Sequence, residues 1–142
     1  MKFLKENLLQ LALLQAIVAT LGSLFFSQIL NLPPCLLCWY QRIFMYPLIV
    51  ILAVGIWKKD KNIPLFVLPL SLIGTIIAIY HNLLYYKIIP ESLAPCTLGV
   101  SCTTKQIELL GFITIPLLSL CAFLLIDVLM LLYKRKLSGK VF

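Results

Sequence analysis

Four long apolar stretches constrain the fold of this chain more than any other feature. They run from Leu8 to Leu30, from about Leu36 to Trp57, from Ile63 to Tyr86 and from Leu109 to Tyr133. A helix needs ~20 predominantly apolar residues to cross a hydrocarbon core of ~30 Å, and each stretch meets or approaches that length. Only 12% of the residues are charged, against about a quarter in a soluble domain. The sequence therefore predicts an all-α integral membrane protein, with one four-helix transmembrane bundle over residues 1–142.

The basic residues indicate how the bundle is oriented. The net charge of +7 lies in short clusters between the apolar stretches, which is typical of topology signals and argues against a nucleic-acid partner. Nine Lys and Arg residues fall at the two termini and between the second and third stretches, and three fall on the other side, at Arg42, Lys87 and Lys105. The side richer in Lys and Arg is normally cytoplasmic. We therefore expect both termini in the cytoplasm and two loops on the outer face.

Four of the five cysteines lie in or beside these outer loops. Cys35 and Cys38 lie at the end of the short first loop, around Asn31 to Cys35, and Cys96 and Cys102 lie in the second, at residues 87–108. Disulfides persist outside the cytoplasm and are rare within it, so the sequence predicts two of them, one in each loop. Structural staples and a four-cysteine zinc site are the alternatives. A CxxC closes too short a loop to stabilise a fold by much, and an oxidising exterior disfavours four free thiolates, so the pattern favours redox chemistry and no metal.

The stretch PPCLLCWYQR, which begins at Pro33, makes the first pair reactive. Proline suits a helix start, so we expect a helix to begin near Cys35, where unpaired backbone N–H groups and the helix dipole lower the pKa of a thiol. Arg42 follows Cys38 by four residues and shares its helix face, so its charge favours a thiolate at Cys38. An arginine inside a membrane boundary is costly. Either it extends to the outer headgroups, or it faces the oxygen of an apolar electron acceptor such as a quinone.

Three segments resemble one known family. CLLCWYQRIFMYP (35–47), PCTLGVSC (95–102) and GFITIP (111–116) are similar to the DsbB family of disulfide bond formation proteins, and most similar to its short BdbC-type members. The resemblance covers roughly residues 21–120. A CxxC alone is a weak motif, but a CxxC followed by arginine at plus four, with a later loop pair, is specific. The resemblance implies a thiol:quinone oxidoreductase in a bacterial cell membrane. It would reoxidise an extracytoplasmic DsbA-like thiol oxidase and reduce menaquinone or ubiquinone, and so support disulfide formation in exported proteins.

The same resemblance implies a role for each residue of the site. Cys96 would form the mixed disulfide with the thioredoxin-fold partner, and Cys102 would resolve it. Cys35 would exchange with the loop pair through a transient bridge to Cys102. Cys38 would face the quinone, with Arg42 assisting. The redox-active disulfides would thus join Cys35 to Cys38 and Cys96 to Cys102.

Five further residues are candidates for a role. His81, the only histidine, is near the outer end of the third stretch and either hydrogen-bonds a quinone oxygen or packs between helices. Trp39 and Tyr40 are expected to belong to an interfacial aromatic belt. Cys121, in the fourth stretch, is expected to be a buried and inert thiol. Asp127 has no assigned role beyond pairing with another helix or with basic residues.

Three rival functions remain open from the residues alone. A vitamin K epoxide reductase-like protein also joins a CxxC to loop cysteines, but it places the loop pair first, whereas here Cys35 comes first. A carrier that moves electrons outward would need reactive cysteines on the inner side. A non-catalytic scaffold or zinc-binding protein would hold metal and free outer thiols. The cysteine order and the loop positions favour the DsbB-like function.

Overall fold

Four long helices dominate the structure, a computed structural model that describes residues 2–94, 102, 108–109 and 113–139. Helix α1 spans Lys2–Leu24 and continues as a short π-helix, η1, over Phe25–Ile29. The other three are α2 at Leu36–Lys58, α3 at Ile63–Tyr85 and α4 at Ile115–Ser138. Each of the four is long and apolar enough to cross a membrane. The predicted four-helix membrane protein is therefore confirmed.

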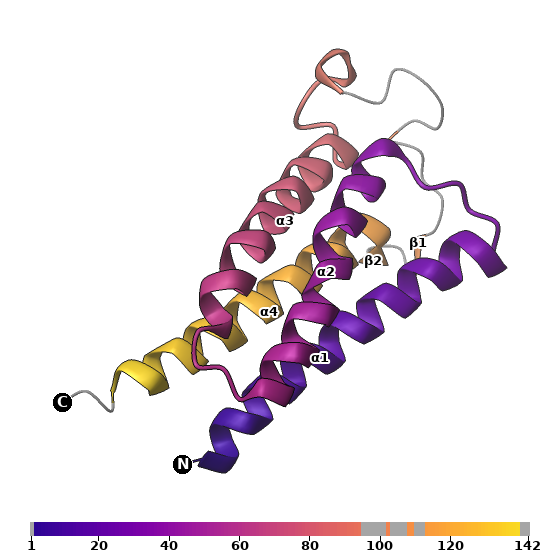
Figure 1. Ribbon diagram of the computed structural model, residues 1–142. Helices are drawn as coiled ribbons and strands as arrows, with labels where there is room; N and C mark the ends of the chain where they lie inside the picture. Colours follow the sequence, from indigo (N-terminus) through magenta and orange to yellow (C-terminus); the bar gives the residue numbers. More distant parts are fainter. Residues whose placement is uncertain (1, 95–101, 103–107, 110–112, 140–142) are drawn as a thin grey trace.

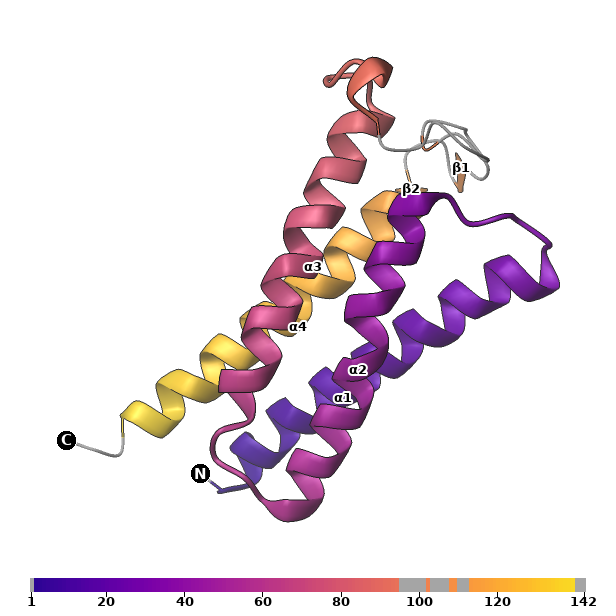
Figure 2. The ribbon, with the colours of Figure 1, turned by 45° about the horizontal axis from the view of Figure 1, so that its top comes forward.

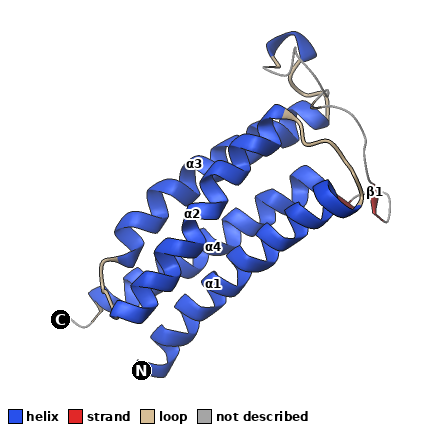
Figure 3. Cartoon of the chain, turned by 45° about the vertical axis from the view of Figure 1, so that its right-hand side comes forward, coloured by secondary structure: helices blue, strands red, loops and turns tan. Residues whose placement is uncertain are grey.

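The helices form a closed ring of neighbours. Helix α1 packs on α2 and α4, and α3 packs on the same two helices (Figure 1). Figure 3 shows α1 alongside α4 and α2 alongside α3. The beginning of α1 and the end of α4 lie at one end of the bundle (Figures 1 and 2), as an even number of spans requires. Toward the other end α1 diverges from α2 (Figure 2).

Close packing between α3 and α4 depends on one glycine. The core contains fully buried Leu48, Val67, Phe123 and Met130. A Cβ atom at Gly74 would overlap the ring of Phe123, so only glycine admits this ring at its present position. Large apolar side chains also cover much of the outer surface, and in a bilayer these contact lipid rather than water.

A polar contact joins the same two helices at mid-membrane depth. The Thr75 hydroxyl lies 2.7 Å from Asp127 Oδ2 and 2.9 Å from the carbonyl oxygen of Ser71. Asp127 is 5% exposed, and its Oδ1 has no hydrogen-bond partner among the described residues. Near the outer end, the Asn82 side chain donates to the carbonyl oxygen of Pro116 at 2.8 Å and so ties the end of α3 to the start of α4.

The fourth helix begins later than the sequence suggests. The apolar stretch predicts a start at residue 109, but α4 starts at Ile115. Two short antiparallel strands precede it, β1 at Glu108–Leu109 and β2 at Ile113–Thr114. Thr114 caps the helix by accepting from the N–H of Leu117, and Pro116 suits the first turn because it has no N–H to leave unpaired. A cap and a proline therefore determine this boundary.

The boundaries of α2 and α3 are close to the predicted ones, whereas α1 starts earlier and α4 ends later, at Ser138 instead of Tyr133. Helices α2 and α3 were predicted at residues 36–57 and 63–86, within one residue of their observed ends. Helix α2 ends where Lys59 adopts a left-handed conformation with φ 53°. Helix α1 was predicted from residue 8 and starts at Lys2. Its first turns contain Lys and Glu, which are too polar for the membrane core but favour helix. A short 3₁₀ turn, η2, covers Glu91–Leu93 beyond α3.

Candidate functional site

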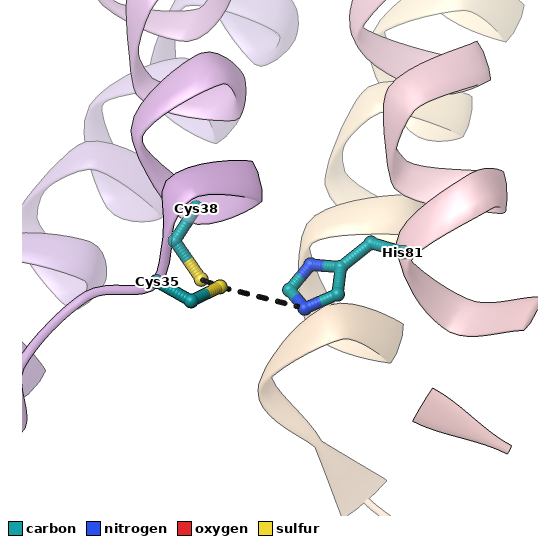
Figure 4. Close-up of side chains that lie close together, drawn as sticks. All are labelled: Cys35, Cys38 and His81. Atoms are coloured by element: carbon teal, nitrogen blue, oxygen red, sulfur yellow. Dashed lines mark hydrogen bonds between the residues drawn. The ribbon is translucent and has the colours of Figure 1, made fainter. Parts of the chain in front are cut away.

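A cluster of two thiols and an imidazole lies at the end of the bundle opposite the termini. Cys35 is the N-cap of α2, with an extended backbone at φ −71° and ψ 170°, and Cys38 lies in the first turn. Their sulfurs are 3.1 Å apart, and Cys35 Sγ is 3.7 Å from His81 Nε2 on α3 (Figure 4). The predicted helix start at Cys35 is confirmed. Two helices thus bring together residues that are 46 positions apart.

A glutamine extends this cluster into the bundle. Gln41 Nε2 lies 3.2 Å from His81 Nδ1, and both side chains are buried, at 6% and 2% exposure. The chain of contacts runs Gln41–His81–Cys35, so the amide orients the ring that faces the sulfur. Gln41 was not predicted from the sequence. The available signal was a polar side chain inside an apolar stretch, three residues after Cys38 and therefore on a neighbouring part of the helix surface.

The surroundings make Cys35 the more nucleophilic sulfur of the pair. The pKa of the Cys35 thiol is lowered well below its usual range, chiefly because the Cys38 thiol hydrogen-bonds to it. Burial opposes the shift, and the hydrogen bond and the electrostatic interaction with His81 add to it. From the sequence, the helix start was expected to lower the pKa of both thiols, and Arg42 to favour a thiolate at Cys38 further. The contribution of His81 to the pKa of Cys35 was not expected, because this contact depends on how α3 packs beside α2.

Arg42 is buried and bound to α1. Its Nε donates to Ser23 Oγ at 2.9 Å and its Nη2 to the Ser23 carbonyl oxygen at 3.0 Å. The guanidinium also lies 5.4 Å from the centre of the Trp39 ring. With 9% exposure, the side chain does not extend to the headgroups, so that alternative is wrong. Arg42 instead joins α1 to α2 where the two helices begin to separate.

A cavity of about 290 Å³ lies between α1, α2 and α4. Most of its lining is apolar, and it includes Val18, Met45 and Leu118. Cys38 and Arg42 also lie on its wall. An apolar cavity with a few polar groups is the usual form of a small-molecule site. This cavity therefore places a thiol and a guanidinium beside the space that an apolar ligand would fill.

Cys35, unlike Cys38, is not among the residues that line the cavity, and it lies in a buried cluster. Cys35 belongs to a buried cluster with Leu37, Leu84 and Cys102, and Cys38 packs against this cluster. Cys102 is 4% exposed and disulfide-bonded, whereas Cys35 and Cys38 are free thiols. The structure thus places one cysteine of the second outer loop against the CxxC pair. Cys96 lies outside the described residues.

The remaining candidates lie apart from the cluster. Trp39 and Tyr40 are 52% and 43% exposed, as residues of an aromatic belt are. Cys121 is an exposed free thiol on α4, so the expectation that it is buried was wrong. It lies on the lipid-facing side of the helix, which the hydrophobicity of α4 alone does not distinguish from the core side. Asp127 contacts Thr75 rather than any cysteine.

Four membrane-spanning helices with a dithiol and an imidazole at one end define a multi-pass membrane thiol–disulfide protein. The family model of disulfide bond formation protein DsbB matches residues 5–133. The chain therefore belongs to the DsbB family, and the resemblance seen in the sequence is confirmed. It is a membrane protein of disulfide bond formation, and the family implies a disulfide oxidoreductase.

Several relatives cover nearly the whole chain. It is 46% identical over 125 residues to disulfide bond formation protein C of Bacillus subtilis (strain 168). The aligned residues cover 87% of this chain and 89% of the relative. It is 41% identical over 131 residues to a probable disulfide formation protein of Metapseudomonas resinovorans, covering 92% and 91%. It is 44% identical over 131 residues to probable disulfide formation protein C of Halalkalibacterium halodurans, covering 92% and 96%. No solved structure matches the chain.

Proposed function

We propose that the chain is a thiol:quinone oxidoreductase that reoxidises a DsbA-like thiol oxidase outside the cytoplasm and passes the electrons to a membrane quinone. One observation carries the proposal. Within the CxxC pair, Cys35 belongs to the same buried cluster as Cys102, and Cys38, which packs against that cluster, also lies on the wall of the apolar cavity with Arg42. A pair in this position connects a cysteine of the outer loop to a site for a lipid-soluble acceptor.

Thiol–disulfide exchange then gives the order of steps. A thiolate of the partner attacks Cys96, and Cys102 leaves as a thiolate. The partner's second thiol resolves the mixed disulfide, and not Cys102 as expected from the resemblance, because attack by Cys102 on Cys96 would release the partner still reduced. The partner thus departs oxidised and Cys96 becomes a thiol. Cys102 attacks Cys35 and displaces Cys38 as a thiolate. Attack by Cys96 on Cys102 restores the loop disulfide and leaves Cys35 and Cys38 reduced.

The CxxC pair returns to its disulfide when it gives two electrons and two protons to a quinone, which becomes a quinol. The residues around the cavity fit such a ligand. Its volume of about 290 Å³ is near the lower end of the ~300–1,000 Å³ usual for small-molecule sites, which suits a ring more than a long tail. Thr20 and Tyr46 line it, and each has a buried hydroxyl without a partner among the described residues. These hydroxyls and Arg42 supply hydrogen bonds for carbonyl oxygens.

His81 acts at Cys35 in this proposal. Its Nε2 is within 3.7 Å of Cys35 Sγ, where it stabilises the thiolate and holds the proton exchanged with it. A hydrogen bond from His81 to the quinone, one of the two roles considered from the sequence, stays a prediction. The observed geometry supports a role beside the sulfur.

The cysteines are proposed to face outward from a bacterial cytoplasmic membrane. The basic residues gather at the end of the bundle that holds both termini, and this end is cytoplasmic by the positive-inside rule. Cys35 and Cys38 lie at the opposite end. An oxidising exterior is also where the disulfide of Cys102 would persist.

The test is turnover of the purified protein in detergent, with a reduced thioredoxin-fold partner and a soluble quinone. Quinol formation is followed by absorbance. Replacement of Cys38 by serine (Cys38→Ser) should abolish turnover, and Arg42→Ala should raise the KM for quinone about tenfold or more, since a hydrogen bond to a charged group contributes ~1.5–3 kcal/mol. Cys121→Ser is the matched control and should leave turnover unchanged. Undiminished turnover of Cys38→Ser would rule the proposal out.

A further inference from the structure

The cluster of Cys35, Cys38 and His81 also has the composition of a metal site. One ligand atom from each residue, two Sγ and an imidazole nitrogen, lies within 4.8 Å of the others. Two cysteines, one histidine and a water in the fourth position form a known zinc ligand set. We propose that the reduced CxxC pair binds Zn²⁺ together with His81, and that the metal-bound form is unable to pass electrons.

The spacing of the three ligands is close to that of a tetrahedral zinc site. Bonds of ~2.3 Å to sulfur and ~2.0–2.1 Å to nitrogen place two sulfurs ~3.8 Å apart and a sulfur and a nitrogen ~3.6 Å apart. The observed separations are 3.1 Å between the sulfurs and 3.7 Å from Cys35 Sγ to His81 Nε2. The Cys35–His81 pair is thus already spaced for zinc. The sulfurs need to separate by ~0.7 Å, and Cys38 Sγ, which lies within 4.8 Å of the imidazole ligand atom, needs to reach ~3.6 Å from it. Rotation about χ1 of Cys38 changes both separations.

The charges favour the metal in this buried location. A zinc ion with two thiolates and a neutral imidazole has no net charge, whereas an unpaired thiolate in an apolar region carries a desolvation cost. The guanidinium of Arg42 is a nearby cation, and it is directed to Ser23 on α1 by two hydrogen bonds. Cys38 also lines the cavity, so a water bound to the fourth position has space on that side.

Gln41 supports the histidine as a metal ligand. When Nε2 of a histidine binds zinc, Nδ1 carries the proton and usually donates it to an acceptor, and loss of that acceptor costs ~10–100-fold in affinity. Gln41 lies 3.2 Å from His81 Nδ1. An amide offers either its nitrogen or its oxygen after a half-turn, so Gln41 is able to accept from Nδ1 when the metal is bound.

Zinc binding at this site depends on the redox state of the pair. The disulfide between Cys35 and Cys38 has no thiolate to offer, so the metal binds only after reduction. The inference rests on the proposed function in one respect, because reduced Cys35 and Cys38 arise in each catalytic cycle. The zinc complex then competes with reoxidation, and a chelator releases it.

The test measures metal binding directly, without quinone or a thiol partner. The full chain carries Cys96→Ser and Cys102→Ser, so that the loop cysteines contribute no ligand. After reduction and removal of the reductant, Zn²⁺ affinity is measured by competition with a chromophoric chelator. Co²⁺ is used as a second probe, because its absorption reports thiolate ligands and tetrahedral geometry. We expect one Zn²⁺ per reduced protein and none bound at this site after oxidation of the pair.

Two variants separate the proposed ligands from the thiols alone. In the same background, His81→Ala should weaken Zn²⁺ binding at least tenfold and change the Co²⁺ spectrum. Gln41→Leu should weaken Zn²⁺ binding about tenfold, and Cys121→Ser should leave it unchanged. Equal affinity with and without His81, or no stoichiometric binding by the reduced chain, would overturn the inference. Either result leaves the turnover assay untouched, so it does not bear on the proposed function.

Discussion

The two sulfurs of the CxxC pair have different surroundings, and the difference begins with single residues. Cys35 shares a hydrogen bond with Cys38 and lies beside His81, and both contacts lower its pKa. A thiol with a lowered pKa forms its nucleophilic thiolate at lower pH. In the reduced pair, Cys35 is therefore the first of the two sulfurs to form a thiolate, while Cys38 lies on the wall of the cavity.

This asymmetry predicts a pH dependence for alkylation of the reduced pair. Because His81 lowers the pKa of Cys35, removing it in His81→Ala should raise that pKa, so the thiolate forms only at higher pH. The midpoint of the pH profile for alkylation of Cys35 should move upward, and a shift of one unit lowers the rate about tenfold on the acidic side. Iodoacetamide labelling and peptide mass spectrometry measure it in a chain that retains only Cys35 and Cys38. Tyr80→Phe, beside the histidine, is the control, and an unmoved midpoint in His81→Ala would contradict the role given to His81.

The sequence was sufficient to identify most residues of the site, but not the side chains that each of them contacts. The spacing of Cys35, Cys38 and Arg42 marked the motif, and the helix start followed from the preceding prolines. The contact of His81 with Cys35 joins residues on different helices, and it depends on the rotation of α3 relative to α2. The periodicity of a uniformly apolar stretch contains little information about that rotation. The same limit explains why Gln41 was missed.

At the scale of elements, the contact between α3 and α4 depends on Gly74. The variant Gly74→Ala places a methyl group inside the space of the Phe123 ring, so the ring or a helix has to move. Such overpacking typically costs ~1–3 kcal/mol, and the midpoint of thermal unfolding in detergent should fall. The double variant with Phe123→Leu should recover part of the loss. Gly22→Ala is the control, since a Cβ atom at Gly22 would meet nothing within 4 Å. An unchanged midpoint for Gly74→Ala would show that the helices are not packed this closely.

The polar contact between the same helices gives a second prediction. Asp127→Asn keeps the shape of the side chain and supplies N–H groups to Thr75, so it should be tolerated. Asp127→Leu removes the contact and leaves the Thr75 hydroxyl to its own helix. Interhelical hydrogen bonds of this kind contribute ~0.6–2 kcal/mol in membranes, so the leucine variant should unfold at lower temperature than the asparagine variant. If the leucine variant were the more stable one, the contact would not hold α3 to α4.

Hydropathy predicted the ends of some helices accurately and the ends of others poorly. Helices α2 and α3 are bounded by turns with polar residues, and their ends were predicted within one residue. The segment before α4 is also apolar, so hydropathy extended the helix over it. The structure places β2 there, and the cap at Thr114 starts the helix. Hydropathy locates residues that suit the membrane, whereas caps and prolines determine where a helix begins.

At the scale of the whole molecule, the proposed orientation predicts which loops are accessible. In a cysteine-free chain in intact cells, a membrane-impermeant maleimide should label Ile88→Cys from outside, because this exposed position follows α3. It should label Lys61→Cys, in the connection between α2 and α3, only after the membrane is permeabilised. The cysteine-free chain treated with the same reagent controls for background. The reverse labelling pattern would invert the topology and place the CxxC pair in the cytoplasm.

The burial of Cys35 together with Cys102 has a consequence for selectivity. Cys35 and Cys102 are 6% and 4% exposed and share one apolar cluster. In the proposed function, exchange between these two sulfurs takes place in an apolar environment. We therefore expect glutathione and other small soluble thiols to compete only where the protein partner binds. Burial of both sulfurs therefore makes the proposed exchange selective for the thiols of the protein partner.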